Sequence, residues 1–299
     1  MQYFEKGAGV PAVTGCNMTV NIKGYAKINL FLDILGKMKN GYHSLFMIMQ
    51  TVSLYDEITL DTCREGIELI CSDRSLPTDE KNIAYKAAMV FFEKTGIKSG
   101  VKITIKKNIP VKAGLAGGSA DAAAVIMGLN EIFGKPLNER EMCFLGLACG
   151  SDVPFAIKGG TCLSQGRGGL LSPLRSLPPY YIVVVKPGSD VQTSSAFAAA
   201  DSVRLFHPDI NEIAEICESG DYDTLLKKCE NVFEQVIEVP ERVEIKRIMS
   251  EHGSLLSQMS GSGPSVFGIF ENECDANKAA EKLKKICPFV AVTRPVSFR

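Results

Sequence analysis

Residues 110–124 read Pro-Val-Lys-Ala-Gly-Leu-Ala-Gly-Gly-Ser-Ala-Asp-Ala-Ala-Ala, and they are the most informative part of the chain. It follows residues 101–106, whose alternation of apolar and polar side chains predicts a strand. An alanine-rich run typical of a helix begins at about Ser119. Glycines in between let the backbone approach a ligand closely. The first N–H groups and the positive dipole end of the helix point back into this loop. The order of strand, glycine loop and helix therefore predicts a phosphate site.

The glycine loop alone does not decide between a phosphate site and a simple turn. The Walker pattern Gly-x4-Gly-Lys-Ser/Thr does not occur in the sequence, so this is not the common P-loop. A glycine-rich entry to a helix, without any ligand, explains the loop equally well. The choice depends on the segments around it.

Composition narrows the classes of function. The chain has 299 residues, of which 45% are hydrophobic and 22% charged, which suits one large globular unit or two domains. The net charge of −1 and the lack of a basic run give no sign of nucleic-acid binding. No apolar run reaches the roughly 18 residues of a membrane span, so we expect no membrane association. Ten cysteines without a Cys-x-x-Cys pair indicate free thiols and a cytoplasmic location.

Periodicity predicts two α+β domains with a boundary near 165–180. We assign the first domain to 19–170 and the second to 171–299. Residues 1–18 have no helical or strand period, and we treat them as an N-terminal extension that can be disordered. The expected strands are 20–35, 45–60, 67–71, 101–106, 180–185, 264–270 and 289–295. The expected helices are 82–94, 119–132, 138–149, 209–217, 221–230, 241–251 and 274–285.

Three further segments carry polar side chains that suit a reactive site. Lys27 and Asn29 are two residues apart on a predicted strand and therefore share one face, which is awkward in a core. Tyr42 and His43 follow a turn signal. Asp152 stands between a helix end and a proline. Taken singly, each has a plain alternative: an exposed strand edge, a surface loop, or an aspartate that stabilises a turn.

Together these motifs resemble those of the GHMP kinases, which include galactokinase, homoserine kinase and mevalonate kinase. The matching segments, in chain order, are 26–30 (Ala-Lys-Ile-Asn-Leu), 41–43 (Gly-Tyr-His), 114–123 (Gly-Leu-Ala-Gly-Gly-Ser-Ala-Asp-Ala-Ala), 150–155 (Gly-Ser-Asp-Val-Pro-Phe) and 260–265 (Ser-Gly-Ser-Gly-Pro-Ser). The first two are similar to those of the members that act on a cytidyl-diphosphate substrate. The loop departs from the family pattern, because Ala116 and Ala120 replace a glycine and a serine.

The resemblance implies a fold and a reaction. The N-terminal domain would be like domain 2 of ribosomal protein S5, and the C-terminal domain would be ferredoxin-like. The implied reaction transfers the γ-phosphoryl of ATP to the 2-hydroxyl of 4-diphosphocytidyl-2-C-methyl-D-erythritol, in non-mevalonate isoprenoid biosynthesis. Mg²⁺ would accompany ATP, and the sequence names no protein ligand for the metal.

The resemblance also implies roles for individual residues. Asp152 would accept the hydroxyl proton, and Lys27 would lie beside it. The cytidyl substrate would bind at Asn29, Tyr42, His43, Phe197, Gly261 and Ser262. ATP would bind at Asn82, Lys107, Pro110, Val111, Lys112, Ala113, Gly114, Leu115, Ala116, Gly117, Gly118, Ser119 and Ala120.

Other functions remain open at this point. A sister kinase for homoserine or mevalonate would have no cytosine slot, which would make Tyr42 and His43 incidental. An S5-like RNA-binding protein would need a basic face and salt-sensitive affinity. An inactive ATP sensor would have lost Lys27 or Asp152, and both are present. We expect a small-molecule substrate, no nucleic acid, no membrane, and a monomer or homodimer.

Overall fold

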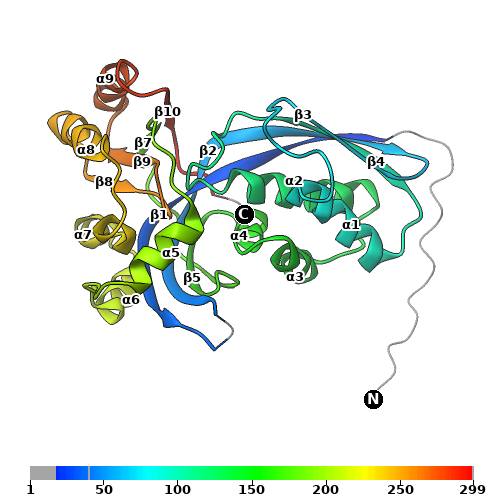
Figure 1. Ribbon diagram of the computed structural model, residues 1–299, viewed down its shortest axis with the longest axis horizontal. Coiled ribbons are helices and arrows are strands. Elements are labelled where there is room, and N and C mark those ends of the chain that lie inside the picture. The colour runs from blue at the N-terminus through cyan, green and yellow to red at the C-terminus, as the bar shows by residue number, and fades with distance from the viewer. Residues whose placement is uncertain (1–17, 40, 298–299) are drawn as a thin grey trace.

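The computed structural model describes residues 18–39 and 41–297, which form two sheets with helices packed on them (Figure 1). The first sheet has six strands in the order β3-β4-β2-β5-β6, and β1 pairs with β2. Its centre is a long antiparallel pair, β1 and β2, whose side chains are nearly all buried in the middle of each strand. The strands are β1 (Thr19–Lys37), β2 (His43–Cys63), β3 (Ile67–Cys71), β4 (Gly100–Lys106), β5 (Thr161–Gly166) and β6 (Leu170–Pro173).

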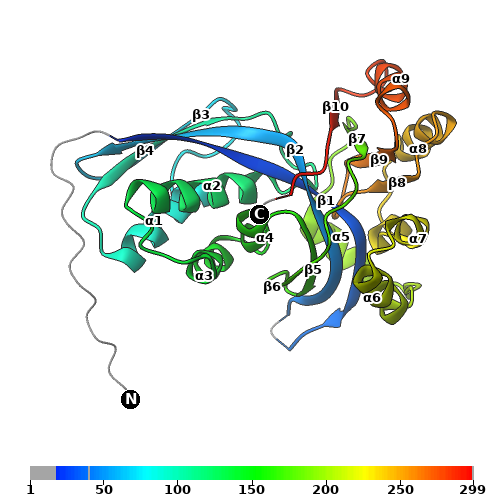
Figure 2. The ribbon, with the colours of Figure 1, turned by 180° about the vertical axis from the view of Figure 1, so that it is seen from behind.

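Four helices cover one face of this sheet (Figures 1 and 2). They are α1 (Ile83–Thr95), α2 (Gly117–Ile132), α3 (Glu139–Cys149) and α4 (Val153–Lys158). The alanine-rich α2 is the innermost, with eleven of its sixteen residues buried. Its small side chains let it approach both the sheet and α1: a Cβ added at Gly128 would lie 2.5 Å from Leu60 Cδ1. This close packing fixes the N-terminus of α2, where the glycine loop ends.

The second sheet is antiparallel and has the order β10-β7-β9-β8. Numbered by their order along the chain, the four strands stand side by side in the order 4-1-3-2. Helices connect the first strand to the second and the third strand to the fourth. This is the ferredoxin-like arrangement. The strands are β7 (Tyr181–Lys186), β8 (Leu256–Met259), β9 (Val266–Phe270) and β10 (Phe289–Thr293). The helices are α5 (Thr193–Asp201), α6 (Ile210–Ser219), α7 (Tyr222–Lys228), the short 3₁₀ helix η1 (Val232–Gln235), α8 (Arg242–Glu251) and α9 (Glu273–Leu283).

The two halves share one hydrophobic cluster. Ile28 and Leu30 of β1 belong to the same buried cluster as Val184 of β7 and Phe267 of β9. Backbone bonds also cross between the halves, because the Leu32 N–H donates to the Glu230 carbonyl at 2.9 Å. The strand that carries Lys27 and Asn29 is therefore anchored to both halves.

The predicted α+β class and most predicted elements are confirmed, and the short elements between them were missed. The sequence did not indicate α4, β5, β6, α5, η1 or β8, most of which are six residues or fewer and too short for periodicity to show. The first sheet ends at Pro173 and the second begins at Tyr181, while the exact domain limits stay a prediction. Met18 is already part of the fold, since its N–H donates to Thr62 Oγ1 at 2.8 Å. The rest of the expected extension, 1–17, lies outside the described residues.

Candidate active site

A cavity of about 800 Å³ lies where β1, the glycine loop, the start of α4 and the start of α5 meet. Eighteen of the twenty-one residues expected at the site line it, including both proposed catalytic residues. They are Lys27, Asn29, Tyr42, His43, Lys107, Pro110, Val111, Lys112, Ala113, Gly114, Ala116, Gly117, Gly118, Ser119, Asp152, Phe197, Gly261 and Ser262. The structure thus brings together segments that are up to 235 positions apart in the sequence.

Lys27 and Asp152 meet at the cavity wall. Lys27 Nζ lies 3.7 Å from Asp152 Oδ2, and it donates to Asn29 Oδ1 at 2.6 Å and to the Gly114 carbonyl at 3.2 Å. Burial lowers the pKa of Lys27 below its usual value, and the carboxylate of Asp152 opposes this effect. Asp152 stands at the N-cap position of α4, but its side chain makes no capping bond. The alternative of an aspartate that merely caps a helix is therefore not what the structure shows.

The local backbone of β1 aims Lys27 and Asn29 into the cavity. The pairing of β1 with β2 shifts register between Tyr25 and Lys27 and again between Asn29 and Phe31, so irregularities flank Lys27 and Asn29 on both sides. Such bulges re-aim side chains next to functional sites. The expectation that the two side chains share one face is confirmed by their hydrogen bond.

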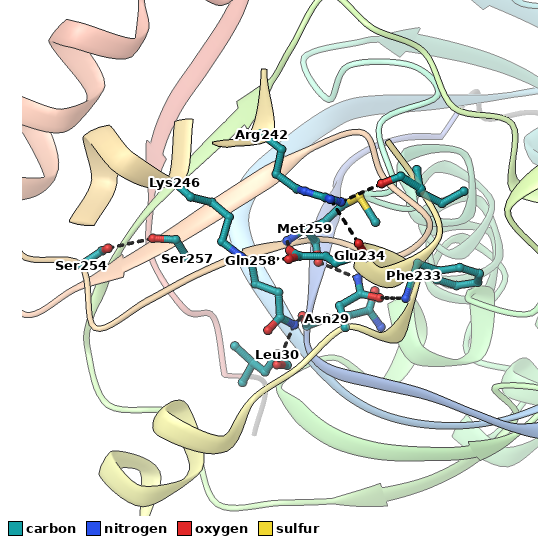
Figure 3. Close-up of polar contacts among 12 residues, drawn as sticks. Asn29, Leu30, Phe233, Glu234, Arg242, Lys246, Ser254, Ser257, Gln258 and Met259 are labelled. Carbon is teal, nitrogen blue, oxygen red and sulfur yellow. Dashed lines mark hydrogen bonds and ion pairs between the residues drawn. The ribbon is translucent and has the colours of Figure 1, made fainter. Parts of the chain in front are cut away.

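The second half of the chain supports this strand from behind (Figure 3). Gln258 Nε2 donates to the carbonyl of Leu30 at 3.1 Å and to that of Asn29 at 3.4 Å. In the same region the Met259 N–H donates to Glu234 Oε1 at 2.7 Å. When every buried polar group in a network has a hydrogen-bond partner, the network favours one arrangement of its side chains. The position of Asn29 is therefore fixed by residues that lie more than 200 positions later.

The glycine loop ends in a helix N-terminus that faces the cavity. The helix α2 begins at Gly117, two residues earlier than expected, and Ala116 at its N-cap makes no side-chain capping bond. The first N–H groups of α2 are thus available to an anion. Ala116 has φ +56°, a left-handed conformation that glycine adopts more easily. Gly114 must be glycine for a different reason: its φ is +72°, and a Cβ there would lie 2.2 Å from the Ser260 carbonyl oxygen.

Lys107 lines the cavity, but its ammonium group is held by two aspartates. Lys107 Nζ lies 2.5 Å from Asp56 Oδ2 and 2.7 Å from Asp121 Oδ2, and all three side chains are at most 6% exposed. Burial alone would lower the pKa of Lys107, but the two carboxylates raise it above its usual value. Burial and the neighbouring Asp56 raise the pKa of Asp121, although Lys107 opposes this. A Cβ at Gly117 would lie 3.3 Å from Lys107 Nζ, so this cluster lies directly beneath the loop.

Aromatic rings gather at the other end of the cavity. His43 stacks on Phe197 with ring centroids 4.6 Å apart and an interplanar angle of 17°. His43 Nε2 lies 2.6 Å from Asp201 Oδ1, and Lys37 Nζ lies 2.7 Å from Asp201 Oδ2. These two partners lower the pKa of Asp201. The guanidinium of Arg167 lies over the ring of Tyr42 at 3.6 Å from its centroid.

Three of the expected residues do not line the cavity. Asn82 instead caps α1, because its Oδ1 accepts from the Ala84 N–H at 2.9 Å and its Nδ2 donates to the Pro77 carbonyl. Leu115 and Ala120 are each 1% exposed and belong to the hydrophobic core. An asparagine directly before a helical pattern is a common N-cap, and this signal was available in the sequence.

The structure adds residues to the site that the sequence did not suggest. Arg167 and Thr193 line the cavity, and Asp201 contacts His43. Arg167 lies in a turn, Gly166-Arg-Gly-Gly169, whose glycines could have drawn attention. Asp201 had no local signal, because its partner His43 is 158 positions away.

No helix within 18–39 or 41–297 is long and apolar enough to cross a membrane. Over the same residues, no group of three or more histidine, cysteine, aspartate or glutamate side chains is arranged to hold a metal ion. Nine cysteines in this part of the chain are free thiols.

Comparison with known sequences identifies the family. Residues 82–160 match the GHMP kinases N terminal domain, and residues 198–288 match the GHMP kinases C terminal domain. The 4-diphosphocytidyl-2-C-methyl-D-erythritol kinase of Clostridium botulinum strain Eklund 17B is 44% identical over 280 residues, which is 93% of this chain and all of that protein. The enzyme of the same name from Caldicellulosiruptor saccharolyticus is 44% identical over 91% of this chain and 95% of its own.

Solved structures agree with the sequence comparison. A crystal structure of 4-(cytidine 5'-diphospho)-2C-methyl-D-erythritol kinase superposes with a TM-score of 0.78 at 30% identity, covering 93% of this chain and all of that one. Homoserine kinase from Cytophaga hutchinsonii superposes with a TM-score of 0.73 at 18% identity, covering 99% and 97% of the two chains, which shows a shared fold. The chain therefore belongs to the GHMP kinase family and, within it, groups with the 4-diphosphocytidyl-2-C-methyl-D-erythritol kinases.

Proposed function

We propose that this protein transfers the γ-phosphoryl group of ATP to the 2-hydroxyl of 4-diphosphocytidyl-2-C-methyl-D-erythritol, a step of non-mevalonate isoprenoid biosynthesis. The observation that carries the proposal is the pairing of Lys27 with Asp152, 3.7 Å apart, in one cavity with a free helix N-terminus and an aromatic cluster. This arrangement offers a reactive pair, a phosphate cradle and a nucleobase platform. A kinase for homoserine or mevalonate would not need the nucleobase platform.

The reaction needs an activated hydroxyl, in-line geometry and neutralised charge. The substrate oxygen forms a bond to the γ-phosphorus, the bond from that phosphorus to the β–γ bridging oxygen breaks, and the hydroxyl proton passes to Asp152. A carboxylate is a weak base at pH 7. It suffices here because a loose transition state gives up the proton late. Lys27 orients Asp152 and stabilises the negative charge that develops.

ATP would lie along the phosphate loop with its phosphates at the N-terminus of α2. Gly117, Gly118 and Ser119 supply the first N–H groups of that helix. Ser119, the hydroxyl side chain of the loop 110–120, lines the cavity and would help to hold a Mg²⁺ that arrives with ATP. The ion would neutralise phosphate charge when bound.

The cytidine end would lie at Tyr42, His43 and Phe197. In the present arrangement His43 and Phe197 stack on each other at 4.6 Å, which leaves no room for a base between them. We therefore assign the base to the Tyr42 side, with its edge against the imidazole of His43. Stacking on an aromatic side chain is worth about 1–3 kcal/mol per base. Asn29, Gly261 and Ser262 would then face the methylerythritol.

Coupled ADP release tests the assignment directly. We expect turnover of the cytidyl-diphosphate substrate and negligible turnover of mevalonate and homoserine at the same concentration. Equal rates with all three would contradict the proposal, and turnover of mevalonate alone would reassign the enzyme. The nine free thiols among the described residues also favour a cytoplasmic location, which fractionation of the host cell would check.

A further inference from the structure

Four cationic side chains line the cavity, and two of them have no acidic partner. Lys27 lies beside Asp152, and Lys107 is held by two aspartates. Lys112 of the phosphate loop and Arg167 of the β5–β6 turn make no ion pair with any described residue. The two substrates of the proposed reaction bring two polyphosphate groups. Lys112 lies in the loop assigned to ATP, which leaves Arg167 without an assigned anion.

Arg167 lies between the two ends of the acceptor site. On one side its guanidinium lies 3.6 Å from the centroid of the Tyr42 ring. On the other side the next residue, Gly168, packs on the turn that carries Asp152, because a Cβ there would lie 3.2 Å from the Ser151 carbonyl oxygen. Arg167 therefore lies on the wall of the cavity that also holds Tyr42 and Asp152, near the path of a substrate that reaches from one to the other.

The turn around Arg167 is held in place while the side chain itself is loosely held. Ser164 Oγ donates to the Gly168 carbonyl at 3.1 Å, and the Gly168 N–H donates to the Gln165 carbonyl at 3.2 Å. Among described residues, the guanidinium of the exposed Arg167 makes no hydrogen bond or ion pair, and it lies over the ring of Tyr42, which is 52% exposed. Such a cation–π contact is weaker than a charge-assisted hydrogen bond to phosphate, so an anion can recruit the side chain from Tyr42.

We propose that Arg167 binds the diphosphate of the acceptor substrate and so selects nucleoside-diphosphate-linked alcohols over unphosphorylated nucleosides. This inference rests on the proposed function and adds a residue to it. A planar guanidinium can contact two phosphate oxygens at once, which a lysine cannot match geometrically. Arg167 is therefore a specificity-determining residue that does not take part in the transfer itself.

The test compares Arg167→Gln with the parent in two measurements. The KM for the cytidyl-diphosphate substrate should rise about 10-fold or more, the scale of one lost charge-assisted hydrogen bond, while the KM for ATP stays within 2-fold. In calorimetric titration the affinity for cytidine diphosphate should fall by a similar factor, and that for cytidine by less than 2-fold. Arg167→Lys should recover only part of the loss.

A matched control is available in the same chain. Arg294 lies over the ring of Tyr181 at 4.0 Å, outside the cavity, so Arg294→Gln removes the same kind of contact and should change neither affinity. Equal weakening of cytidine and cytidine diphosphate in Arg167→Gln would overturn the proposal, because Arg167 would then only order Tyr42. A parent protein that binds cytidine diphosphate but does not phosphorylate the substrate would overturn the proposed function alone. A parent that binds neither ligand would overturn both.

Discussion

Lys27 and Lys107 both have buried side chains next to the glycine loop, and the protein surrounds them differently. Lys27 has one carboxylate neighbour at 3.7 Å, and burial lowers its pKa. Lys107 has two carboxylates within 2.7 Å, and they raise its pKa. A lysine with spare charge can stabilise a developing anion, whereas a fully neutralised one holds structure. For these two lysines, the number of carboxylate neighbours indicates the role, whereas burial alone does not.

Replacing Lys107 should have the largest effect, and that effect should be on stability. Lys107→Met leaves the buried carboxylates of Asp56 and Asp121 without their cation, which costs about 3–5 kcal/mol of the free energy of unfolding. Urea denaturation measures this loss. Lys27→Met is the matched variant: Asp152 is partly exposed, so this protein should stay folded and lose activity. Equal loss of stability in both variants would contradict the assignment of a structural role to Lys107 and a catalytic role to Lys27.

Removing the carboxylate beside Lys27 should act on the chemical step. Asp152→Asn keeps the shape but removes the base, so kcat should fall by about 10² or more, or about 2.7 kcal/mol of transition-state stabilisation. The KM for ATP should change little, because the phosphate loop is untouched. Steady-state kinetics at saturating acceptor gives both values. If kcat stays within a few-fold of the parent, Asp152 is a turn residue.

The pH dependence of activity should separate the two lysines without any substitution. Because the pKa of Lys27 lies below its usual value, activity should fall as the pH rises through that lowered pKa. Lys107 has a raised pKa, so its contribution to stability is present at lower pH and is lost only above the usual lysine range. Activity should therefore be lost at a lower pH than stability. A pH–rate profile beside melting temperatures in the same buffers checks the order, and coincident transitions would contradict it.

The smallest expected effect concerns the backbone of the glycine loop at Ala116. Ala116 has φ +56°, which costs an L-residue about 1–2 kcal/mol, and glycine avoids this cost while losing about 0.4–1 kcal/mol through its freer unfolded chain. Ala116→Gly should therefore raise the free energy of unfolding by up to about 1.6 kcal/mol in urea denaturation. Ala198→Gly in α5, an exposed helical position, is the control and should lower it by about 0.5–1 kcal/mol. A destabilised Ala116→Gly protein would mean that the alanine side chain itself packs favourably.

The sequence predicted the contiguous parts of the site better than the dispersed ones. The glycine loop between β4 and α2 was recognisable because strand, glycines and helix follow each other within about 30 residues. The face shared by Lys27 and Asn29 followed from strand geometry alone. The partners of Lys107 could not be foreseen, because Asp56 is 51 positions away and its pairing depends on how β2 and β4 align. Asn82 is the opposite case, since its place directly before a helical pattern was a local capping signal that the structure bears out, while its role at ATP stays a prediction.

The strand β1 has a consequence for how the protein unfolds. It hydrogen-bonds to β2 along the first sheet, bridges to Asn231 in the second half, and places Ile28 and Leu30 in a cluster shared with Val184 and Phe267. If the second half unfolded alone, the apolar side chains of the first half in that cluster would become exposed to water, at a cost in free energy. We therefore expect the two halves to unfold as one cooperative unit, so that calorimetry records a single heat-absorption peak. Gene fragments divided near residue 175 would each encode half of a core.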